Sequence, residues 1–317
     1  MVLHDLLCRA ELRADPLLPA NHGDPGAEAL HPGAGRSRDL PPSHRRARQG
    51  EKGEVTMQDR EWDDHLSWHA EATFYHTRIW SRILQAAFPA LRDAGIWLSA
   101  PGARATLPLH EWRRLGGAWT TLQSSFPFLY GGPVPRRIGE VDLMAEALRA
   151  LADRGRSYAL VGNPFAPGPA QSPKETSVSE DRTHILTLPA THEEYWDGVL
   201  STAKRNDVRR LTKKGVTVRL DEDGAQAGTI YRFYRLSFAR WGGRPGLVYP
   251  EGLYRAMLRL GEGHVRLYVA EHEGRVLGGA FIVRWNGHVH YHAGYFDHEA
   301  RSLRPNVLLQ ERIIRDA

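Results

Sequence analysis

The stretch that decides the fold spans residues 264–296 and is written HVRLYVAEHEGRVLGGAFIVRWNGHVHYHAGYF. Its pattern predicts three β-strands joined by two-residue turns, Glu273-Gly274 and Asn286-Gly287. Asn-Gly suits a type I′ turn because both of its central residues need a positive φ. We therefore expect an antiparallel three-stranded unit here.

The Asn-Gly turn also sets the register of the second hairpin. The expected pairs are Trp285 with His288, Val283 with His290, and Phe281 with His292. The three histidines then share one face with large apolar side chains, and Val289, Tyr291 and Ile282 make the opposite face apolar as well. A sheet that is apolar on both faces is usually covered on both, so we expect this hairpin to be buried.

The alternating histidines raise the question of a metal site. A strand rises about 3.4 Å per residue, which places His288 and His292 roughly 13 Å apart. Zinc needs its nitrogen ligands about 2 Å from one centre, so three such histidines do not converge on one ion, and we predict no metal site. Two interpretations remain open: a hydrogen-bonded core histidine, or a general base in a cleft.

Outside this stretch, composition divides the chain. Residues 1–56 hold no Phe, Trp or Tyr, whereas all nine tryptophans of the 317-residue sequence come later. We predict that 1–56 are a disordered leader, because such a segment buries too little apolar surface to offset its chain entropy. Met57 is then the expected start of translation, and a genuine basic tail is the alternative.

Bulk features point to a cytoplasmic protein. Cys8 is the only cysteine, which leaves no disulfide framework or thiolate metal site. No secretory signal and no apolar run long enough for a membrane helix is present. The net charge of +5 permits an anionic partner such as phosphate, nucleic acid or acidic lipid without choosing among them.

The patterned region alternates helices and strands, typical of a mixed α/β fold. We expect a first domain at 57–165, a Pro/Ser-rich linker or long loop at 166–181, and a second domain at 182–317. Helices are predicted at 74–91, 139–155, 191–215, 225–240, 250–261 and 306–317. Strands are predicted at 95–100, 103–112, 157–162 (buried), 183–189 and 216–221. Gly215 is the expected C-cap of the 191–215 helix.

Two basic segments are candidate anion sites. The 191–215 helix has a basic surface made by Lys204, Arg205 and Arg209. This surface is either an ordinary solvated face or a binding site for phosphate or an RNA backbone. Pro305 suits the first turn of the last helix, whose free N–H groups lie beside Arg301 and Arg304. The alternative there is an ordinary helix start.

Together these parts resemble the FemABX-like proteins of the GNAT superfamily. The run LSTAKRNDVRRLTKKGVTVRL (200–220) resembles their Ser-x-x-Lys-Arg-x-x-x-Arg-x-x-x-Lys-Gly-Val segment, and 267–317 resembles the core of their second domain. The pieces EWDDHLSWHAEATFYHTRIW, LPL, FPFLYGGPV and YAL look like the first domain. The resemblance covers about 57–317. It implies two tandem GNAT-like domains, each a mixed, largely antiparallel sheet flanked by helices.

The resemblance also implies a reaction and its residues. An acyl or aminoacyl group would pass from acyl-CoA or aminoacyl-tRNA, as a co-substrate without a tightly bound cofactor, to an amine of a cell-envelope or peptidoglycan-type acceptor. The last helix start, with Arg301, Arg304 and Asn306, would face donor phosphates. Lys204, Arg205 and Arg209 would meet a lipid-linked or other acceptor phosphate, or tRNA. His290, Tyr291, His292 and Tyr295 would line the acyl-transfer cleft.

One feature departs from the family pattern. The sequence ends at Ala317, within the last predicted helix, whereas a GNAT domain continues into a further strand. We therefore expect a C-terminally truncated second domain. This keeps two alternatives open: a truncated, non-catalytic binding remnant of the family, and an RNA-binding module carried by the basic helix.

Overall fold

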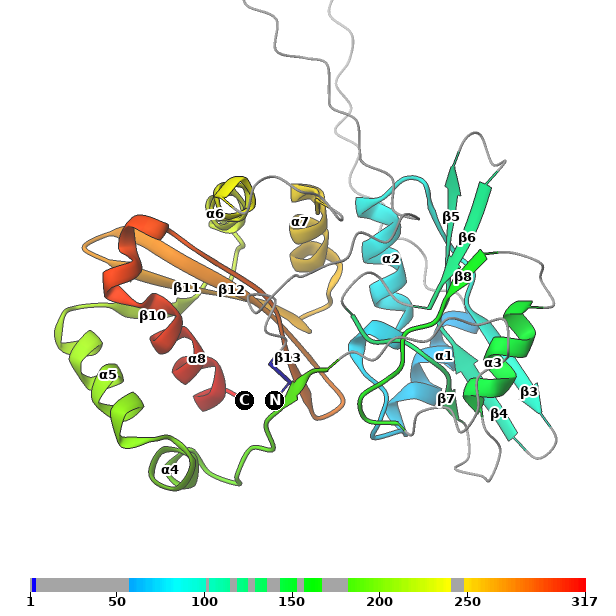
Figure 1. Ribbon diagram of the computed structural model, residues 1–317, viewed down its shortest axis with the longest axis horizontal. Helices are drawn as coiled ribbons and strands as arrows, with labels where there is room; N and C mark the ends of the chain where they lie inside the picture. The colour runs from blue at the N-terminus through cyan, green and yellow to red at the C-terminus, as the bar shows by residue number, and fades with distance from the viewer. Residues whose placement is uncertain are drawn as a thin grey trace, which may run out of the picture.

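The computed structural model describes residues 2–3, 57–100, 103–114, 119–124, 129–135, 143–152, 157–166, 182–240 and 248–317. Helices flank mixed sheets in which antiparallel pairs predominate, as the family resemblance implied (Figure 1). The division into tandem domains at 166–181 stays a prediction, because residues 167–181 lie outside the described ranges.

The second half is built on a six-stranded sheet of order β10-β11-β12-β13-β1-β9. Its strands are β10 (Thr217–Leu220), β11 (Val265–His272), β12 (Arg275–Trp285), β13 (His288–Phe296), β1 (Val2–Leu3) and β9 (His184–Ile185). β1 pairs in parallel with β13, and the remaining neighbours are antiparallel. Val2–Leu3 are the described part of the predicted leader; its other residues lie outside the described ranges.

Helices cover both faces of this sheet, which confirms the expected two-sided burial (Figure 1). Helices α6 (Ala227–Arg240) and α7 (Glu251–Leu260) pack on the face that carries Phe281 and Val283. Helix α8 (Pro305–Arg315) packs on the other face, against Ile282 and Val289. The 3₁₀ helix η4 (His298–Leu303) joins β13 to α8.

Both predicted hairpin turns are confirmed. Asn286 and Gly287 have φ of 49° and 74°, and Glu273 and Gly274 have φ of 50° and 75°. Positive φ at both central residues is the mark of a type I′ turn, whose twist matches that of the flanking strands.

The predicted single helix at 191–215 is wrong, because it is broken at Leu200 and Ser201. Helix α4 (His192–Glu194) runs into a π-helical turn, η3 (Tyr195–Val199), and α5 (Thr202–Lys213) begins afresh. The Ser201 side chain accepts the Lys204 N–H and so caps α5. Gly215 closes α5 with φ of 80°, and the N–H groups of Gly215 and Val216 bond back to Thr212 and Leu211, which is the expected glycine C-cap.

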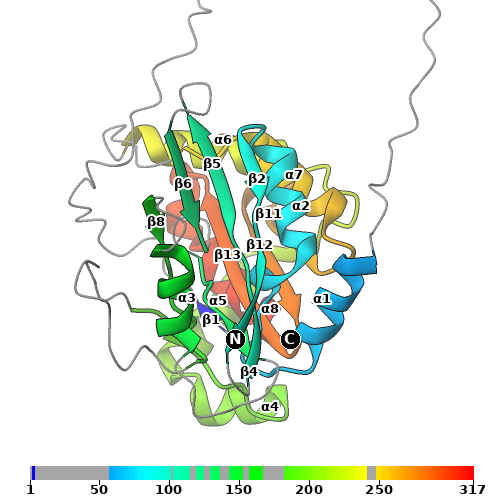
Figure 2. The same cartoon turned by 90° about the vertical axis from the view of Figure 1, so that its right-hand side faces the viewer.

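The first half contains two smaller sheets, of order β2-β5-β6-β8 and β3-β4-β7. In Figure 2 this half of the molecule faces the viewer. Its helices are α1 (Met57–Ser67), η1 (Phe74–His76), α2 (Arg78–Ala87) and α3 (Leu143–Ala152). Its strands are β2 (Leu91–Asp93), β3 (Ile96–Ala100), β4 (Ala103–Leu107), β5 (His110–Arg114), β6 (Trp119–Gln123), β7 (Val134–Pro135) and β8 (Ser157–Ala159). The predicted buried strand at 157–162 is instead short and largely exposed, because β8 lies at a sheet edge.

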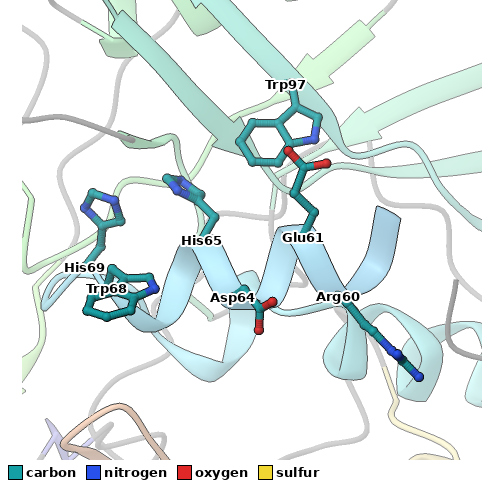
Figure 3. Close-up of a pocket in the computed structure, with 7 residues that line it drawn as sticks. All are labelled: Arg60, Glu61, Asp64, His65, Trp68, His69 and Trp97. Carbon is teal, nitrogen blue, oxygen red and sulfur yellow. The ribbon is translucent and has the colours of Figure 1, made fainter. Parts of the chain in front are cut away.

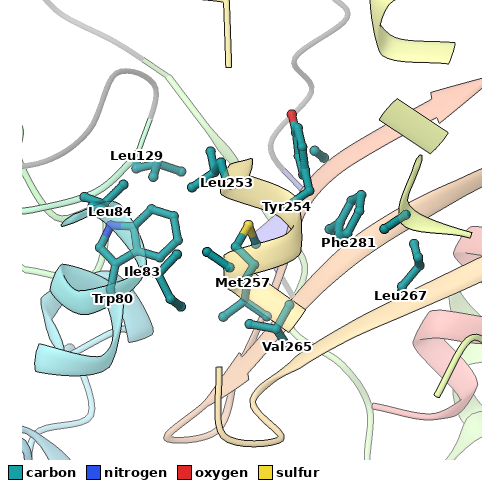
Figure 4. Close-up of a cluster of buried hydrophobic side chains, with 14 of the residues drawn as sticks. Trp80, Ile83, Leu84, Leu129, Leu253, Tyr254, Met257, Val265, Leu267 and Phe281 are labelled. Atoms are coloured by element: carbon teal, nitrogen blue, oxygen red, sulfur yellow. The ribbon is translucent and has the colours of Figure 1, made fainter. Parts of the chain in front are cut away.

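One hydrophobic core joins the two halves of the chain. Figure 4 shows Trp80, Ile83 and Leu84 of α2 pointing toward Leu253 and Met257 of α7. Behind α7 the same core continues into the β11–β13 sheet through Leu267 and Phe281. The first half is therefore packed directly onto the face of the second-half sheet that carries the predicted histidines.

Candidate active site

Strand β13 carries four of the predicted site residues and contains a β-bulge. Trp285 pairs with His288 and Val283 with His290, as expected. The predicted pair of Phe281 with His292 is wrong, because Phe281 pairs with Ala293 and Ile282 with Tyr291. His292 is thus the extra residue opposite β12. A bulge re-aims a side chain and interrupts ladder pairing, and so it is a common feature beside active sites.

The strand divides the four residues between its faces. Tyr291 packs toward α8, with the cluster that includes Leu309 and Ile313. His290, His292 and Tyr295 contact aromatic residues on the α6–α7 side. The structure thus brings three of the four predicted side chains to one face and places Tyr291 on the other.

His290 is enclosed by aromatic rings. Its ring centroid lies 5.1 Å from that of Tyr75 and 5.7 Å from that of Tyr130, and its side chain is 2% exposed. Within the described residues, neither ring nitrogen has a hydrogen-bond partner. Burial, reinforced by the nearby histidines, holds the pKa of His290 well below its ordinary value. His290 is therefore a neutral imidazole inside the junction of the two halves.

His292 connects β13 to the first half of the chain. Its Nδ1 lies 3.1 Å from the hydroxyl of Tyr75, and its ring meets that of Trp80 edge-on at 5.7 Å. This contact with the Tyr75 hydroxyl orients the His292 imidazole. Sequence periodicity missed Tyr75, because it lies 217 residues away in η1.

A group of tyrosines surrounds Tyr295. Its hydroxyl lies 2.8 Å from that of Tyr254, and its ring centroid lies 4.7 Å from that of Tyr234. The Tyr234 hydroxyl accepts the backbone N–H of Tyr249 at 3.1 Å. Burial raises the pKa of Tyr295 and of Tyr254, so both phenols stay protonated at neutral pH.

The predicted donor site lies where β13 leads into α8. Arg304 precedes the helix in the left-handed conformation, with φ of 40°, and its Nη1 donates to Oδ2 of Asp207 on α5 at 2.7 Å. Hydrogen bonding from Arg210, with Arg304 adding to it, holds the pKa of Asp207 below its ordinary value. Arg301 and Asn306 are exposed. Helices α5 and α8 are thus tied together at the end that displays these groups.

The predicted acceptor residues on α5 have different surroundings. Arg205 is held within the chain, because its Nη1 donates to the carbonyl oxygens of Trp196, Asp197 and Leu200 at 2.7 to 3.1 Å. That guanidinium satisfies the carbonyls of the π-helical turn. Lys204 is exposed, and Arg209 lies 5.7 Å above the Trp196 ring. We therefore keep Lys204 and Arg209, and not Arg205, as candidate acceptor ligands.

The histidine row shows no convergence on an ion. The ring centroids of His288 and His290 lie 6.0 Å apart, and Nε2 of His288 bonds to the carbonyl oxygen of Ala70. Across the described ranges, no group of three or more His, Cys, Asp and Glu side chains is arranged to hold a metal ion.

Comparison with known families decides the class of the second half. Residues 201–317 match the family described as the acetyltransferase (GNAT) domain. Residues 201–317 are a GNAT-type domain. This domain contains α5, β10–β13 and α8, together with the β13 bulge and the cationic start of α8. Acyl transfer is the reaction class of such a domain.

Solved structures show the fold of the wider chain. The structure titled "Crystal structure of FemX" is 14% identical, covers 82% of this chain and 84% of its own, and superposes with a TM-score of 0.53. Residues 201–317 and the part of the chain that precedes them, taken together, thus have a FemX-like fold. No curated protein sequence matches significantly.

Two other structures are more distant. The C-terminal domain of a putative lysylphosphatidylglycerol synthetase from Agrobacterium fabrum is 12% identical, covers 82% of this chain and 74% of its own, and has a TM-score of 0.42. A conserved protein of unknown function from Bacteroides thetaiotaomicron is 11% identical, covers 68% and 73%, and has a TM-score of 0.39.

Proposed function

We propose that this protein transfers an acyl or aminoacyl group from acyl-CoA or aminoacyl-tRNA to an amine of a cell-envelope or peptidoglycan-type acceptor. The observation that carries the proposal is the GNAT match over 201–317. That span contains both the bulged strand β13 and the cationic helix start that follows it. The FemX-like fold and the free surface of Lys204 and Arg209 support an anionic, lipid-linked or nucleotide-linked acceptor, or tRNA itself.

Donor binding is assigned to the start of α8. No side chain caps the start of α8, the positive end of the helix dipole favours phosphate there, and Arg301 and Arg304 add two guanidinium groups. The exposed amide of Asn306 offers a further hydrogen bond. We assign no tightly bound cofactor, since the donor itself carries the activated group.

The chemistry is assigned to the α6–α7 face of β13. The amine nitrogen attacks the donor carbonyl, a C–N bond forms, and the bond from the carbonyl carbon to the leaving sulfur or oxygen breaks. His292, oriented by Tyr75, takes the proton that the amine loses and passes it to the leaving sulfur or oxygen. The Tyr295 hydroxyl stays protonated and lines the cleft as a hydrogen-bond donor. The bulge frees backbone groups from the ladder, which suits them to stabilise the developing oxyanion.

The setting of the reaction follows from its donors. Both acyl-CoA and aminoacyl-tRNA are cytoplasmic compounds, so we propose that the protein acts in the cytoplasm. In the part of the chain that the structure describes, no helix is both long enough and apolar enough to cross a bilayer.

The test is transfer from acetyl-CoA or aminoacyl-tRNA to an amine acceptor. Amine-dependent release of CoA thiol, or of deacylated tRNA, is the expected result. Binding of an envelope precursor with no turnover from either donor would contradict the enzyme and favour a binding protein.

Replacing His292 by Gln is expected to lower kcat about 100-fold, within the range for loss of a general base. Gln keeps polarity and approximate size but takes no proton. The measurement is kcat against pH, with Tyr75→Phe as the test of positioning: this variant should shift the pH profile and retain more activity. Equal activity of His292→Gln and the parent at every pH would remove His292 from the mechanism.

Replacing Arg304 by Glu is expected to raise the KM for the donor about 10-fold while changing kcat little, because an attractive phosphate contact becomes repulsive. The effect should shrink as salt rises, since exposed charges are screened. Arg149→Glu, the same charge change at an exposed residue of α3, is the matched control. An equal rise of KM in both variants would show that net charge, and not the start of α8, binds the donor.

A further inference from the structure

A hollow of about 620 Å³ lies in the first half of the chain, and its lining residues include none from β13 or α8. Figure 3 shows Glu61 and His65 of α1 projecting toward Trp97 of β3, while Arg60 and Asp64 project from another side of the helix; all five residues line the hollow. Trp68 and His69 close one end. Small-molecule sites typically measure about 300–1,000 Å³, so the hollow is large enough for one or two sugar rings.

One wall of the hollow is aromatic and rigid. The His65 ring lies 5.2 Å from the Trp97 ring and 4.7 Å from the His69 ring. Behind Trp97 the fully buried Trp62 meets it edge-on at 5.6 Å. Nε2 of His65 lies 3.3 Å from the carbonyl oxygen of Val134, which fixes the imidazole in place. This wall is therefore preformed.

The indole of Trp68 stands at the edge of this hollow and is 86% exposed. It is the most exposed large hydrophobic side chain among the described residues. An indole in water forgoes the hydrophobic stabilisation that a partner surface would supply. Beside a preformed hollow, an unpartnered aromatic plane is suited to stack on a ligand.

The polar groups at the rim select the chemistry of that ligand. Arg60, Asp64 and Trp68 are spaced four residues apart along α1 and the turn that follows it, so they form one row, and Glu61 also lines the hollow. The rim thus offers guanidinium donors and carboxylate acceptors together. An anionic ligand would meet two carboxylates, and a cationic ligand would meet Arg60. A neutral ligand with many hydroxyl groups satisfies both kinds of partner.

We propose that this hollow is a saccharide-binding site. The apolar face of a pyranose ring stacks on Trp68, while its hydroxyl groups donate to Asp64 and Glu61 and accept from Arg60. The site is independent of the acyl-transfer centre, and its occupation requires no donor.

The experiment is calorimetric titration of the full chain with N,N′-diacetylchitobiose and cellobiose, and with tetramethylammonium as the cationic alternative. At least one disaccharide is expected to bind with a Kd on the order of 1 mM. Trp68→Ala should weaken binding about 10-fold or more, and Trp68→Phe about 3-fold, because the smaller ring keeps part of the stacking surface. Leu236→Ala, which truncates an exposed apolar residue of α6, should leave the affinity unchanged.

Binding of neither disaccharide, or binding that Trp68→Ala leaves unchanged, would overturn the proposal. Binding of tetramethylammonium alone would assign the hollow to cations instead. Thermal unfolding of Trp68→Ala should match the parent, since the side chain is exposed. Because no acyl donor is present, failure here leaves the proposed transfer reaction untouched, and failure of transfer leaves this result intact.

Discussion

Acidification from neutral pH to about pH 4 is expected to lower the free energy of unfolding by several kcal/mol, because three histidines are buried in the neutral form. Burial lowers the pKa of His76 and of His110 to about 4, and holds that of His290 well below its ordinary value of 6.5. Unfolding returns each ring to water, where it takes up a proton below about pH 6.5.

The sign follows from proton counts. Between the folded and unfolded pKa values the unfolded chain binds more protons, so stability falls as the pH falls through that window. Each such histidine contributes a slope of about 1.4 kcal/mol per pH unit. Asp63 opposes this trend, because burial raises its pKa to about 6. As the pH falls, the folded chain protonates this carboxyl before the unfolded chain does, and that raises stability. One carboxyl offsets only part of the effect of three imidazoles.

The measurement is urea unfolding at intervals from pH 7 to about pH 4. His110→Gln should reduce the slope of stability against pH by about 1.4 kcal/mol per unit, whatever it does to stability at pH 7. His298→Gln, on exposed η4, should leave the slope unchanged. Identical slopes in His110→Gln and the parent would show that His110 is not buried in neutral form.

Replacing Trp80 by Ala is expected to lower the free energy of unfolding by about 3–5 kcal/mol, the usual cost of removing a large buried aromatic side chain. Trp80 is fully buried in the core shared by the two halves, and its ring contacts those of Tyr75 and His292 edge-on at 5.2 Å and 5.7 Å. The truncation leaves a cavity where η1 meets β13, so the two halves lose contacts together.

Two further variants separate packing from polarity. The indole N–H of Trp80 is buried without a partner among the described residues, so Trp80→Phe removes an unsatisfied donor and should cost only roughly 1–2 kcal/mol. Trp68→Ala makes the same truncation at an exposed site and should change stability by less than about 0.5 kcal/mol. Equal urea midpoints for Trp80→Ala and Trp68→Ala would rule out the shared core as described.

Local signals predicted the second-half sheet well. Asn286-Gly287 and Glu273-Gly274 form the expected turns, and Gly215 ends α5 as expected. These features depend on the φ that a few adjacent residues adopt, and so the sequence alone contains the required information. Prediction failed at Leu200 and Ser201, where the Ser201 cap outweighed the helical pattern on either side.

The candidate site was predicted only in part. The sequence identified His290, His292 and Tyr295 and their common strand, but the bulge at His292 and the bonds to Tyr75 and Tyr254 were not predictable from spacing. The helical pattern predicted an exposed Arg205, whereas in the structure its guanidinium donates to the carbonyl oxygens of Trp196 and Leu200.

The sequence by itself therefore determined the strands β10 to β13, the two hairpin turns, the burial of both sheet faces and the strand on which the histidines lie. The tertiary structure alone decided which of those side chains meet partners from the first half, because such partners lie about two hundred residues away, as Tyr75 does from His292. Hydrophobic periodicity records which way a side chain faces, whereas the identity of its neighbour depends on how separate elements pack.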